Sequence, residues 1–289
     1  MDYKNMPIIN WKALATVNRP NFMAPPPGAV PGENMWDRGA ANYNRMAKLE
    51  AEATTGILNC FETLPTDSVL DCGCGPGRIT VQMAAKAAKV TAMDSAPKML
   101  QFCKDNCAEA GHTNVTFKDL DFFSEEFENG FDEQFDVVIC SRSAGLTDIE
   151  RLAKLSKRLV VLQGFANSPS LPETFSKLFK GCAAEPKHPM MGMNRDRRLD
   201  YNIFFNQIYD MGYEPSLRVM PDYFKGVFDT KEAAYEYLLP LGKVDDDKMD
   251  VFHANVDEYL TQNEDGSYTF RIDTRASVIW FEVNPRKFF

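Results

Sequence analysis

The residues best suited to chemistry form a glycine-rich turn and an acid that follows one strand later. Val69–Thr80 reads V-L-D-C-G-C-G-P-G-R-I-T, and V-T-A-M-D follows at Val90–Asp94. An apolar strand ends at Asp71, and the turn leads into a segment whose apolar residues have helical spacing. The free N–H groups at the start of that helix attract a carboxylate or a phosphate. Because Asp94 ends the second strand, where an acid can bind both hydroxyls of a ribose, the pattern predicts a nucleoside cofactor site.

The spacing of the glycines separates two classes of cofactor. The nicotinamide fingerprint is G-x-G-x-x-G, whereas this chain has G-x-G-x-G, with Arg78 where the third glycine would fall and Asp71 two residues before the first. A turn with a carboxylate beside it suits a ligand that carries an ammonium and a carboxylate. The D-x-G-x-G-x-G form resembles the first motif of class I methyltransferases, and this resemblance implies S-adenosylmethionine as the cofactor.

The resemblance covers about residues 36–165 and implies further cofactor contacts. A short strand at Val115–Asp121 would end in the acid that meets adenine, a role placed on Asp121 and Phe122 with Asp119 as the competitor. The fourth strand is expected at Phe135–Ser143, and its end would lie beside the transferred methyl group. The implied cofactor-binding residues are Asp71, Gly73, Cys74, Gly75, Gly77, Asp94, Ser95, Asp121, Phe122 and Ser141.

Three residues are candidates for the acceptor side, although methyl transfer from a sulfonium needs a base only if the acceptor arrives protonated. Tyr43 lies in W-D-x-x-A-x-x-Y, which resembles the lid segment of related enzymes. Arg142 could hold an acceptor carboxylate or phosphate through its fork of donors, or equally pair with a structural acid such as Asp148. His188, in a loop on the expected substrate side, could act as a base.

Composition restricts the partners of the chain. Its 289 residues are 44% hydrophobic and 25% charged, with a net charge of −9, which disfavours a nucleic-acid surface. We expect no membrane span and no secretory signal. Seven scattered cysteines favour reduced thiols and a cytoplasmic location. Cys72 and Cys74 have no nearby C-x-x-C or histidine partner, so we expect no metal.

The order of the elements predicts an α/β fold with a doubly wound, mostly parallel seven-stranded sheet, helices on both faces and an antiparallel terminal hairpin. Four regions are expected: a connector and lid helix at 1–66, a cofactor-binding core at 67–221, a helical insertion at 222–266 and final strands at 267–289.

Within these regions, single elements are expected as follows. Helices are predicted at 36–61, 97–110, 148–157, 199–211, 229–241 and 247–262, and later strands at 158–165, 217–220, 268–272 and 276–283.

We expect a methyltransferase that acts on a small molecule by in-line transfer. The end of the fourth strand reads C-S-R-S and lacks the N/D-P-P-Y motif common in enzymes that methylate amide or exocyclic nitrogens. The alternatives are a non-catalytic protein that binds S-adenosylmethionine and, less favoured, a nicotinamide oxidoreductase. The sequence identifies neither the acceptor nor the oligomeric state.

Overall fold

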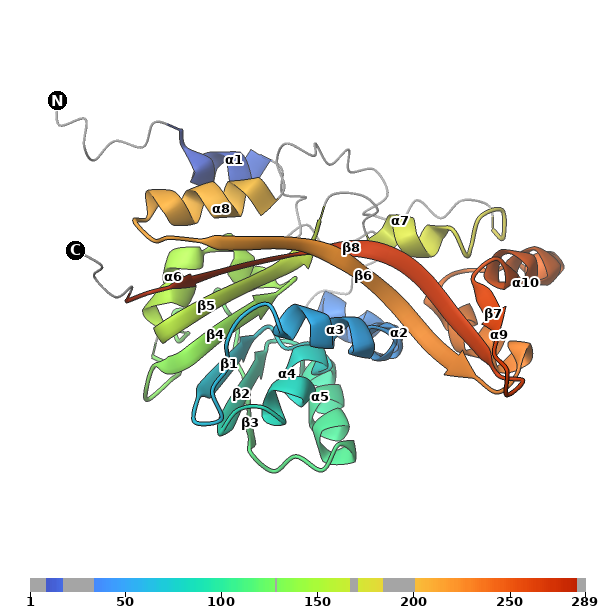
Figure 1. Cartoon of the computed structure of the whole chain (residues 1–289), viewed down its shortest axis with the longest axis horizontal. Coiled ribbons are helices and arrows are strands. Elements are labelled where there is room, and N and C mark those ends of the chain that lie inside the picture. Colours follow the sequence, from blue (N-terminus) through green and yellow to red (C-terminus); the bar gives the residue numbers. More distant parts are fainter. Residues whose placement is uncertain (1–8, 18–33, 128, 167–170, 184–200, 285–289) are drawn as a thin grey trace.

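The computed structural model describes residues 9–17, 34–127, 129–166, 171–183 and 201–284, and one mixed sheet runs through them (Figure 1). The strand order is β3-β2-β1-β4-β5-β8-β6, with β7 paired to β8. β1 to β5 are parallel, and β8 runs antiparallel to β5, β6 and β7. The strands are β1 (Ser68–Cys72), β2 (Lys89–Asp94), β3 (Val115–Asp119), β4 (Phe135–Ser141), β5 (Ser156–Phe165), β6 (Ser216–Phe228), β7 (Leu260–Gln262) and β8 (Tyr268–Glu282).

Helices cover both faces of the parallel part of the sheet. On one face, Ile57 of α3 and Met83 of α4 pack against strand residues such as Val137. On the other face, Leu152 of α6 and Ile208 of α8 lie in a second core. The helices are α1 (Trp11–Val17), α2 (Met35–Leu49), α3 (Ala51–Leu58), α4 (Arg78–Ala84), α5 (Pro97–Glu109), α6 (Ile149–Lys154), α7 (Leu171–Ser176), α8 (Tyr201–Asp210), α9 (Lys231–Leu238) and α10 (Met249–Asp257).

The predicted fold class is therefore confirmed: a mostly parallel, doubly wound sheet ends in an antiparallel hairpin. β1 is buried at every position, as expected for a strand covered on both faces. β7 adds a short eighth strand to the seven predicted, since the expected helix at 247–262 ends at Asp257 and the chain then pairs with β8.

The hairpin of β6 and β8 is much longer than the sheet beside it. β5 pairs with β8 only over residues 276–282, whereas β6 pairs with it from Tyr268 to Trp280. The far part of the hairpin curves away and carries α9, α10 and β7 (Figure 1). There Phe224, Phe252 and Phe270 form a third core, which Leu49 of α2 also enters.

Two predicted elements have other bounds in the structure. The strands expected at 268–272 and 276–283 are one strand, since the polar residues between them keep the in-and-out alternation of a single strand. The strand expected at 217–220 continues to Phe228, so the region from 222 begins as sheet and turns helical only at Lys231.

The helix expected at 36–61 is two helices, α2 and α3. They meet at Glu50, which ends α2 and begins α3 with φ −93° and ψ 0°. Glu50 is buried at this break, with 2% of its surface exposed, because its carboxylate pairs with two arginines beneath it.

Candidate cofactor and acceptor site

The glycine turn connects β1 to α4 at the carboxyl edge of the sheet. Gly73, Gly75 and Gly77 have φ values of +76°, +53° and +91°, a region that residues with a Cβ rarely adopt. The N–H groups of Gly73 and Cys74 both donate to the carbonyl of Met93, at 2.8 and 2.9 Å. The turn is therefore fixed to the end of the neighbouring strand β2.

The three glycines have different surroundings. A Cβ on Gly73 would lie 2.3 Å from Cβ of Ser143, and one on Gly77 would lie 2.8 Å from Sγ of Cys103. These two glycines allow close packing within the protein. A Cβ on Gly75 would meet nothing nearer than Cε1 of Tyr43 at 3.7 Å. Gly75 is thus the glycine of this turn at which a ligand could approach the backbone.

Asp94 connects this turn to the end of β2. Its Oδ2 accepts the N–H of Gly75 at 2.8 Å, and its Oδ1 accepts the N–H of Ala96 at 2.9 Å. Burial raises the pKa of Asp94, and these backbone donors oppose that rise. An ionised carboxylate has about four acceptor positions, so these bonds do not use all of them and a ribose hydroxyl can still be accepted.

Asp71 lies at the carboxyl end of β1 and has no exposed surface. Its Oδ2 accepts the hydroxyl of Thr80 at 2.6 Å, while its Oδ1 is buried without a hydrogen-bond partner. Burial raises the pKa of Asp71 to about 6, against smaller opposing effects of Thr80 and Arg78. A buried acceptor without a partner beside the turn fits a ligand that carries an ammonium group.

The remaining predicted cofactor residues lie around the same edge. Asp121 is exposed, and its side chain accepts the N–H of Phe123 at 2.9 Å. Phe122 is 3% exposed and packs its ring against Phe127, and its carbonyl accepts a hydrogen bond from Arg151 at 2.6 Å, so its N–H is the group left for the expected adenine contact. Asp119, the competitor, pairs in register with Asp94 across β3 and β2.

The two cysteines of the turn belong to different cores. Cys72 packs with the core under α6, and Cys74 packs with Cys103 and Cys107 of α5. All seven cysteines are free. Among the described residues, no three histidine, cysteine or acidic side chains are grouped as metal ligands would be. Nor does the described part contain a helix long and apolar enough to cross a bilayer.

A buried ionic cluster lies at the carboxyl ends of β4 and β5. The carboxylate of Glu50 accepts hydrogen bonds from both terminal nitrogens of Arg142, and the bond from Nη1 to Oε1 is 2.9 Å long. It also pairs with Nε of Arg78 at 3.0 Å. Burial alone would raise the pKa of Glu50, but the two guanidinium groups lower it below its usual value. Of the two interpretations of Arg142, the structure shows the pairing with a structural acid, but that acid is Glu50 and not Asp148, which instead caps α6 by accepting the N–H of Arg151.

Arg78 connects this cluster to the two strand ends. Its terminal nitrogens donate to Thr54 at 2.8 Å, to Ser141 at 2.6 Å and to Gln163 at 3.0 Å. The side chain of Ser141, a predicted cofactor residue, is therefore used within the protein. In the sequence, Arg78 stands out only because it occupies the position of the third glycine of the nicotinamide fingerprint, and its role in the cluster was not predicted.

Tyr43 and Asp222 complete the surroundings of the two arginines. Tyr43, on α2, packs against the same core as Phe165, over which Arg142 lies, and its Cε1 is 3.7 Å from the position that a Cβ on Gly75 would take. Asp222, on β6, is 2% exposed, and its pKa is raised by burial and by Glu50. Tyr43 was predicted for this side, Asp222 was not, and His188 lies outside the described residues.

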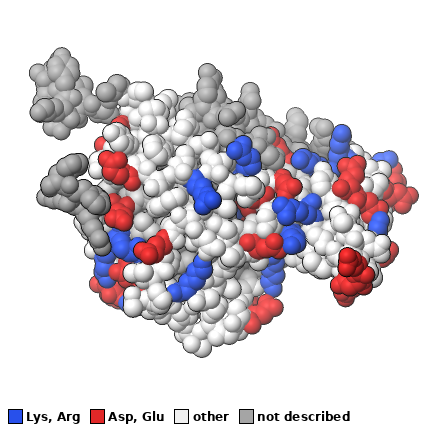
Figure 2. Space-filling model, in the orientation of Figure 1, with Lys and Arg blue, Asp and Glu red and all other residues white. Residues whose placement is uncertain are grey.

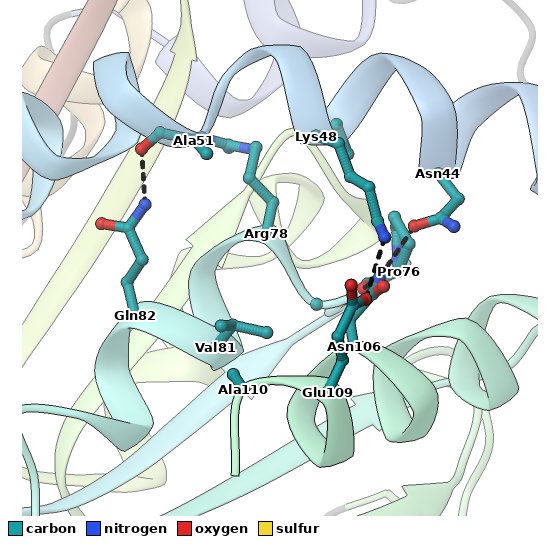
Figure 3. A pocket seen from close by; sticks show the side chains of 12 residues that line it. Asn44, Lys48, Ala51, Pro76, Arg78, Val81, Gln82, Asn106, Glu109 and Ala110 are labelled. Carbon is teal, nitrogen blue, oxygen red and sulfur yellow. Dashed lines mark hydrogen bonds and ion pairs between the residues drawn. The ribbon is translucent and has the colours of Figure 1, made fainter. Parts of the chain in front are cut away.

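A separate cavity of about 270 Å³ lies between α2 and the helices α4 and α5. Figure 3 shows Lys48 of α2 reaching Glu109 of α5 at one side of it, and Gln82 of α4 bonded to the backbone of Ala51 at the other. Of the glycine turn and the start of α4, residues 76–78 line the cavity. Its volume lies below the roughly 300–1,000 Å³ of typical ligand pockets, and neither Asp71 nor Asp94 lines it.

Comparison with known proteins agrees with this geometry. Residues 69–163 match a family described as a methyltransferase domain. This segment contains the glycine turn, Asp94, the candidate adenine contacts and the end of β4. Together with the strand order, the match identifies it as a class I S-adenosylmethionine-dependent methyltransferase domain, and its cofactor is S-adenosylmethionine.

Several proteins resemble the chain. A malonyl-[acyl-carrier protein] O-methyltransferase of Acetivibrio thermocellus is 33% identical over 109 residues, and a 23S rRNA (uracil-C5)-methyltransferase of Klebsiella pneumoniae is 31% identical over 112. Each match covers 36% of this chain, but only 36% of the first protein and 25% of the second. The chain thus spans about a third or less of these relatives.

Two further likenesses extend over most of the chain. An uncharacterized protein of Haemophilus influenzae is 24% identical over 294 residues, which cover 98% of this chain and 92% of that one. The structure of a methyltransferase from Thiobacillus denitrificans with bound S-adenosylhomocysteine is 13% identical, covers 80% of this chain and 90% of that chain, and has a TM-score of 0.42.

Proposed function

We propose that the protein transfers the methyl group of S-adenosylmethionine to a small-molecule acceptor. The observation that carries the proposal is the bond between the N–H of Gly75 and the carboxylate of Asp94. It brings the open glycine of the turn and the acid expected to bind ribose into direct contact at one edge of the sheet. The four-region division of the chain and its cytoplasmic location remain predictions.

The cofactor would extend along this edge. The free carboxylate positions of Asp94 would accept the ribose hydroxyls, and the backbone around Gly75 would receive the amino-acid part. The oxygen of Asp71 that has no partner would face the ammonium group. The adenine ring would meet Asp121 and the N–H of Phe122, as the resemblance implies.

The acceptor would enter on the side of β4 and β5. The methyl group moves to the electron pair of the acceptor while the sulfur takes the electron pair of the broken bond and leaves as a neutral thioether. Alignment of the two reactants supplies much of the rate in such a step. Residues 141–143, Tyr43 and the arginine cluster lie on this side and would position the acceptor.

Charge favours a small molecule over a nucleic acid. The chain has a net charge of −9, and on the face in Figure 2 basic and acidic side chains are intermixed without a continuous basic stripe. A nucleic-acid surface needs such a stripe. One relative is named for methylation of an acyl-carrier-bound malonyl group and another for methylation of rRNA, so both acceptor classes belong in the test.

Labelled methyl transfer tests the proposal. The protein is incubated with S-adenosylmethionine labelled in its methyl group, once with a metabolite extract and once with total RNA, and an Asp94→Ala variant serves as the matched control. We expect label in low-molecular-mass products, and less with the variant. Label in RNA would overturn the small-molecule assignment. Cofactor binding without any labelled product would favour the non-catalytic alternative.

A further inference from the structure

We propose that Arg142, with Tyr43, binds a carboxylate of the acceptor, so that the substrate is a small carboxylic acid. The inference deepens the proposed function and rests on it. It names the class of acceptor, and it assigns to the buried arginine cluster a role in recognition in addition to its role in the fold.

The first observation is a donor that the fold leaves unused. Both terminal nitrogens of Arg142 bond to Glu50, but its Nε is buried and has no hydrogen-bond partner. Only 9% of the side chain is exposed, and its guanidinium lies 4.4 Å from the ring centre of Phe165. A buried charged donor without a partner is unfavourable by itself, and an anion placed beside Nε would satisfy it.

The second observation is the backbone at Arg142. Its φ of +52° is the one positive φ of a non-glycine residue in the described part of the chain. Such a conformation is disfavoured for a residue with a Cβ, and it occurs often at functional sites. It is held by a hydrogen bond from the N–H of Arg142 to the carbonyl of Gln163, at 3.0 Å. The guanidinium of Arg142 contacts Glu50 at the break between α2 and α3.

The third observation is the balance of charge. Arg78 and Arg142 carry two positive charges, and Glu50, which bonds both, carries one negative charge. Asp222 lies near all three, but within the described chain its one hydrogen bond comes from the N–H of Tyr223, and no ion pair of 4.0 Å or less joins it to an arginine. The two guanidinium groups are thus ion-paired to a single carboxylate, so the cluster can pair with one further negative charge.

Tyr43 supplies a second donor at the same place. Its hydroxyl has no hydrogen-bond partner among the described residues, and its ring packs against the same core as Phe165, over which the guanidinium of Arg142 lies. Its Cε1 also lies 3.7 Å from the position that a Cβ on Gly75 would take. Tyr43 therefore stands between the arginine cluster and the glycine turn, and an acceptor held by its hydroxyl and Nε of Arg142 would lie beside the cofactor.

A carboxylate fits these donors better than a phosphate does. The cluster already holds one planar carboxylate, that of Glu50, and a single further charge balances it. A phosphate dianion would bring two charges to one free guanidinium nitrogen and one hydroxyl. The structure therefore favours a monoanionic planar group.

The experiment titrates acetate, and separately inorganic phosphate, into protein saturated with S-adenosylhomocysteine, with binding followed by calorimetry. We expect acetate to bind and phosphate to bind more weakly. Tyr43→Phe and Arg142→Lys each remove one proposed donor and should weaken acetate binding at least about tenfold. Asp222→Asn removes a competing negative charge and should tighten it. Lys48→Gln, which changes an exposed cation that pairs with Glu109 of α5, is the matched control and should have no effect.

The opposite signs expected for Asp222→Asn and Tyr43→Phe separate recognition from a loss of folding, which would weaken binding in every variant. Equal acetate affinity in the wild type and in Tyr43→Phe and Arg142→Lys would overturn the inference, as would tighter binding of phosphate. The absence of acetate binding, with labelled methyl transfer to an uncharged metabolite still observed, would overturn it and leave the proposed function standing.

Discussion

The N–H of Gly75 donates to Oδ2 of Asp94 at 2.8 Å, so the middle of the glycine turn and the end of β2 form one unit. The same carboxylate also accepts the N–H of Ala96, directly before α5. A residue expected to bind ribose therefore also fixes the conformation of the loop expected to bind the amino-acid part of the cofactor.

Replacement of Asp94 by alanine is expected to weaken the binding of S-adenosylmethionine by roughly 1–3 kcal/mol, because the ribose hydroxyls lose their acceptor. Calorimetric titration of the two proteins measures the difference. Asp119→Asn is the control, since Asp119 lies beside Asp94 in register but on the neighbouring strand. Unchanged affinity in Asp94→Ala would contradict the ribose assignment, and a loss in Asp119→Asn alone would move it to that residue.

Alanine substitutions should separate the roles of the three glycines. Gly73→Ala places a Cβ 2.3 Å from that of Ser143 and should lower the free energy of unfolding by more than the roughly 1–2 kcal/mol expected from its positive φ alone. Gly75→Ala meets no such obstacle and should lower cofactor affinity more than stability. Urea denaturation of each variant measures its free energy of unfolding, and calorimetry measures its affinity for the cofactor.

The double variant Gly73→Ala/Ser143→Gly is the matched test of this steric argument. Removal of the Ser143 side chain removes the atoms that the new Cβ would meet, although it also removes the bond from its hydroxyl to the carbonyl of Cys72. The double variant should be more stable than the sum of the two single effects predicts. Strict additivity would show that the two residues do not contact each other as the structure has them.

Removal of Glu50 should destabilise the fold strongly. Glu50→Ala leaves two buried guanidinium groups without their shared carboxylate, a change expected to lower the free energy of unfolding by about 3–5 kcal/mol. Glu52→Gln is the control, because Glu52 is an exposed acid on the next turn that pairs with Lys225, and we expect its unfolding curve to match that of the wild type. Similar curves for both variants would contradict the buried cluster.

Asp71 should make stability depend on pH in a defined window. Its pKa in the folded protein is about 6, above the ordinary 3.8, because burial disfavours its charge. The folded state then holds the proton more tightly than the unfolded state, so this residue's contribution to stability falls as pH rises from about 4 to about 6 and is constant above that. The total change is roughly 3 kcal/mol.

The measurement compares urea denaturation of the wild type and Asp71→Asn at several pH values between 4 and 7. The asparagine side chain of the variant cannot ionise, so the difference between the two proteins should change across this window and level off above it. Because Asp94 and Asp222 also have raised pKa values, only that difference reports on Asp71. Parallel curves throughout would contradict the raised pKa.

Sequence spacing sufficed for the parts of the fold that follow local rules. The glycine turn, β1, β2 and the apolar run of β4 each have a pattern that depends on their own residues, and the structure has them within a residue or two of the prediction. The acid at the end of β2 could be placed for the same reason. These elements are also where the family match lies.

Contacts between distant segments could not be read in this way. Glu50 contacts Arg142 from another part of the chain, and nothing local to Arg142 indicates which acid it meets. One signal was present: Glu50 lies on the same helical face as Met46, Ala53 and Ile57, where a charged residue needs a buried partner. The sequence around Asp222 gave no sign that this residue is buried near the arginines. Its position in β6 depends on the pairing of this strand with β8, which is distant in the sequence.

A crystal structure with bound S-adenosylhomocysteine tests the central claim most directly. We predict density for the amino-acid part along residues 73–77, with the ribose hydroxyls within hydrogen-bond distance of Asp94. Density for the ligand in the cavity between Lys48 and Glu109, or anywhere else away from Asp94, would contradict the account.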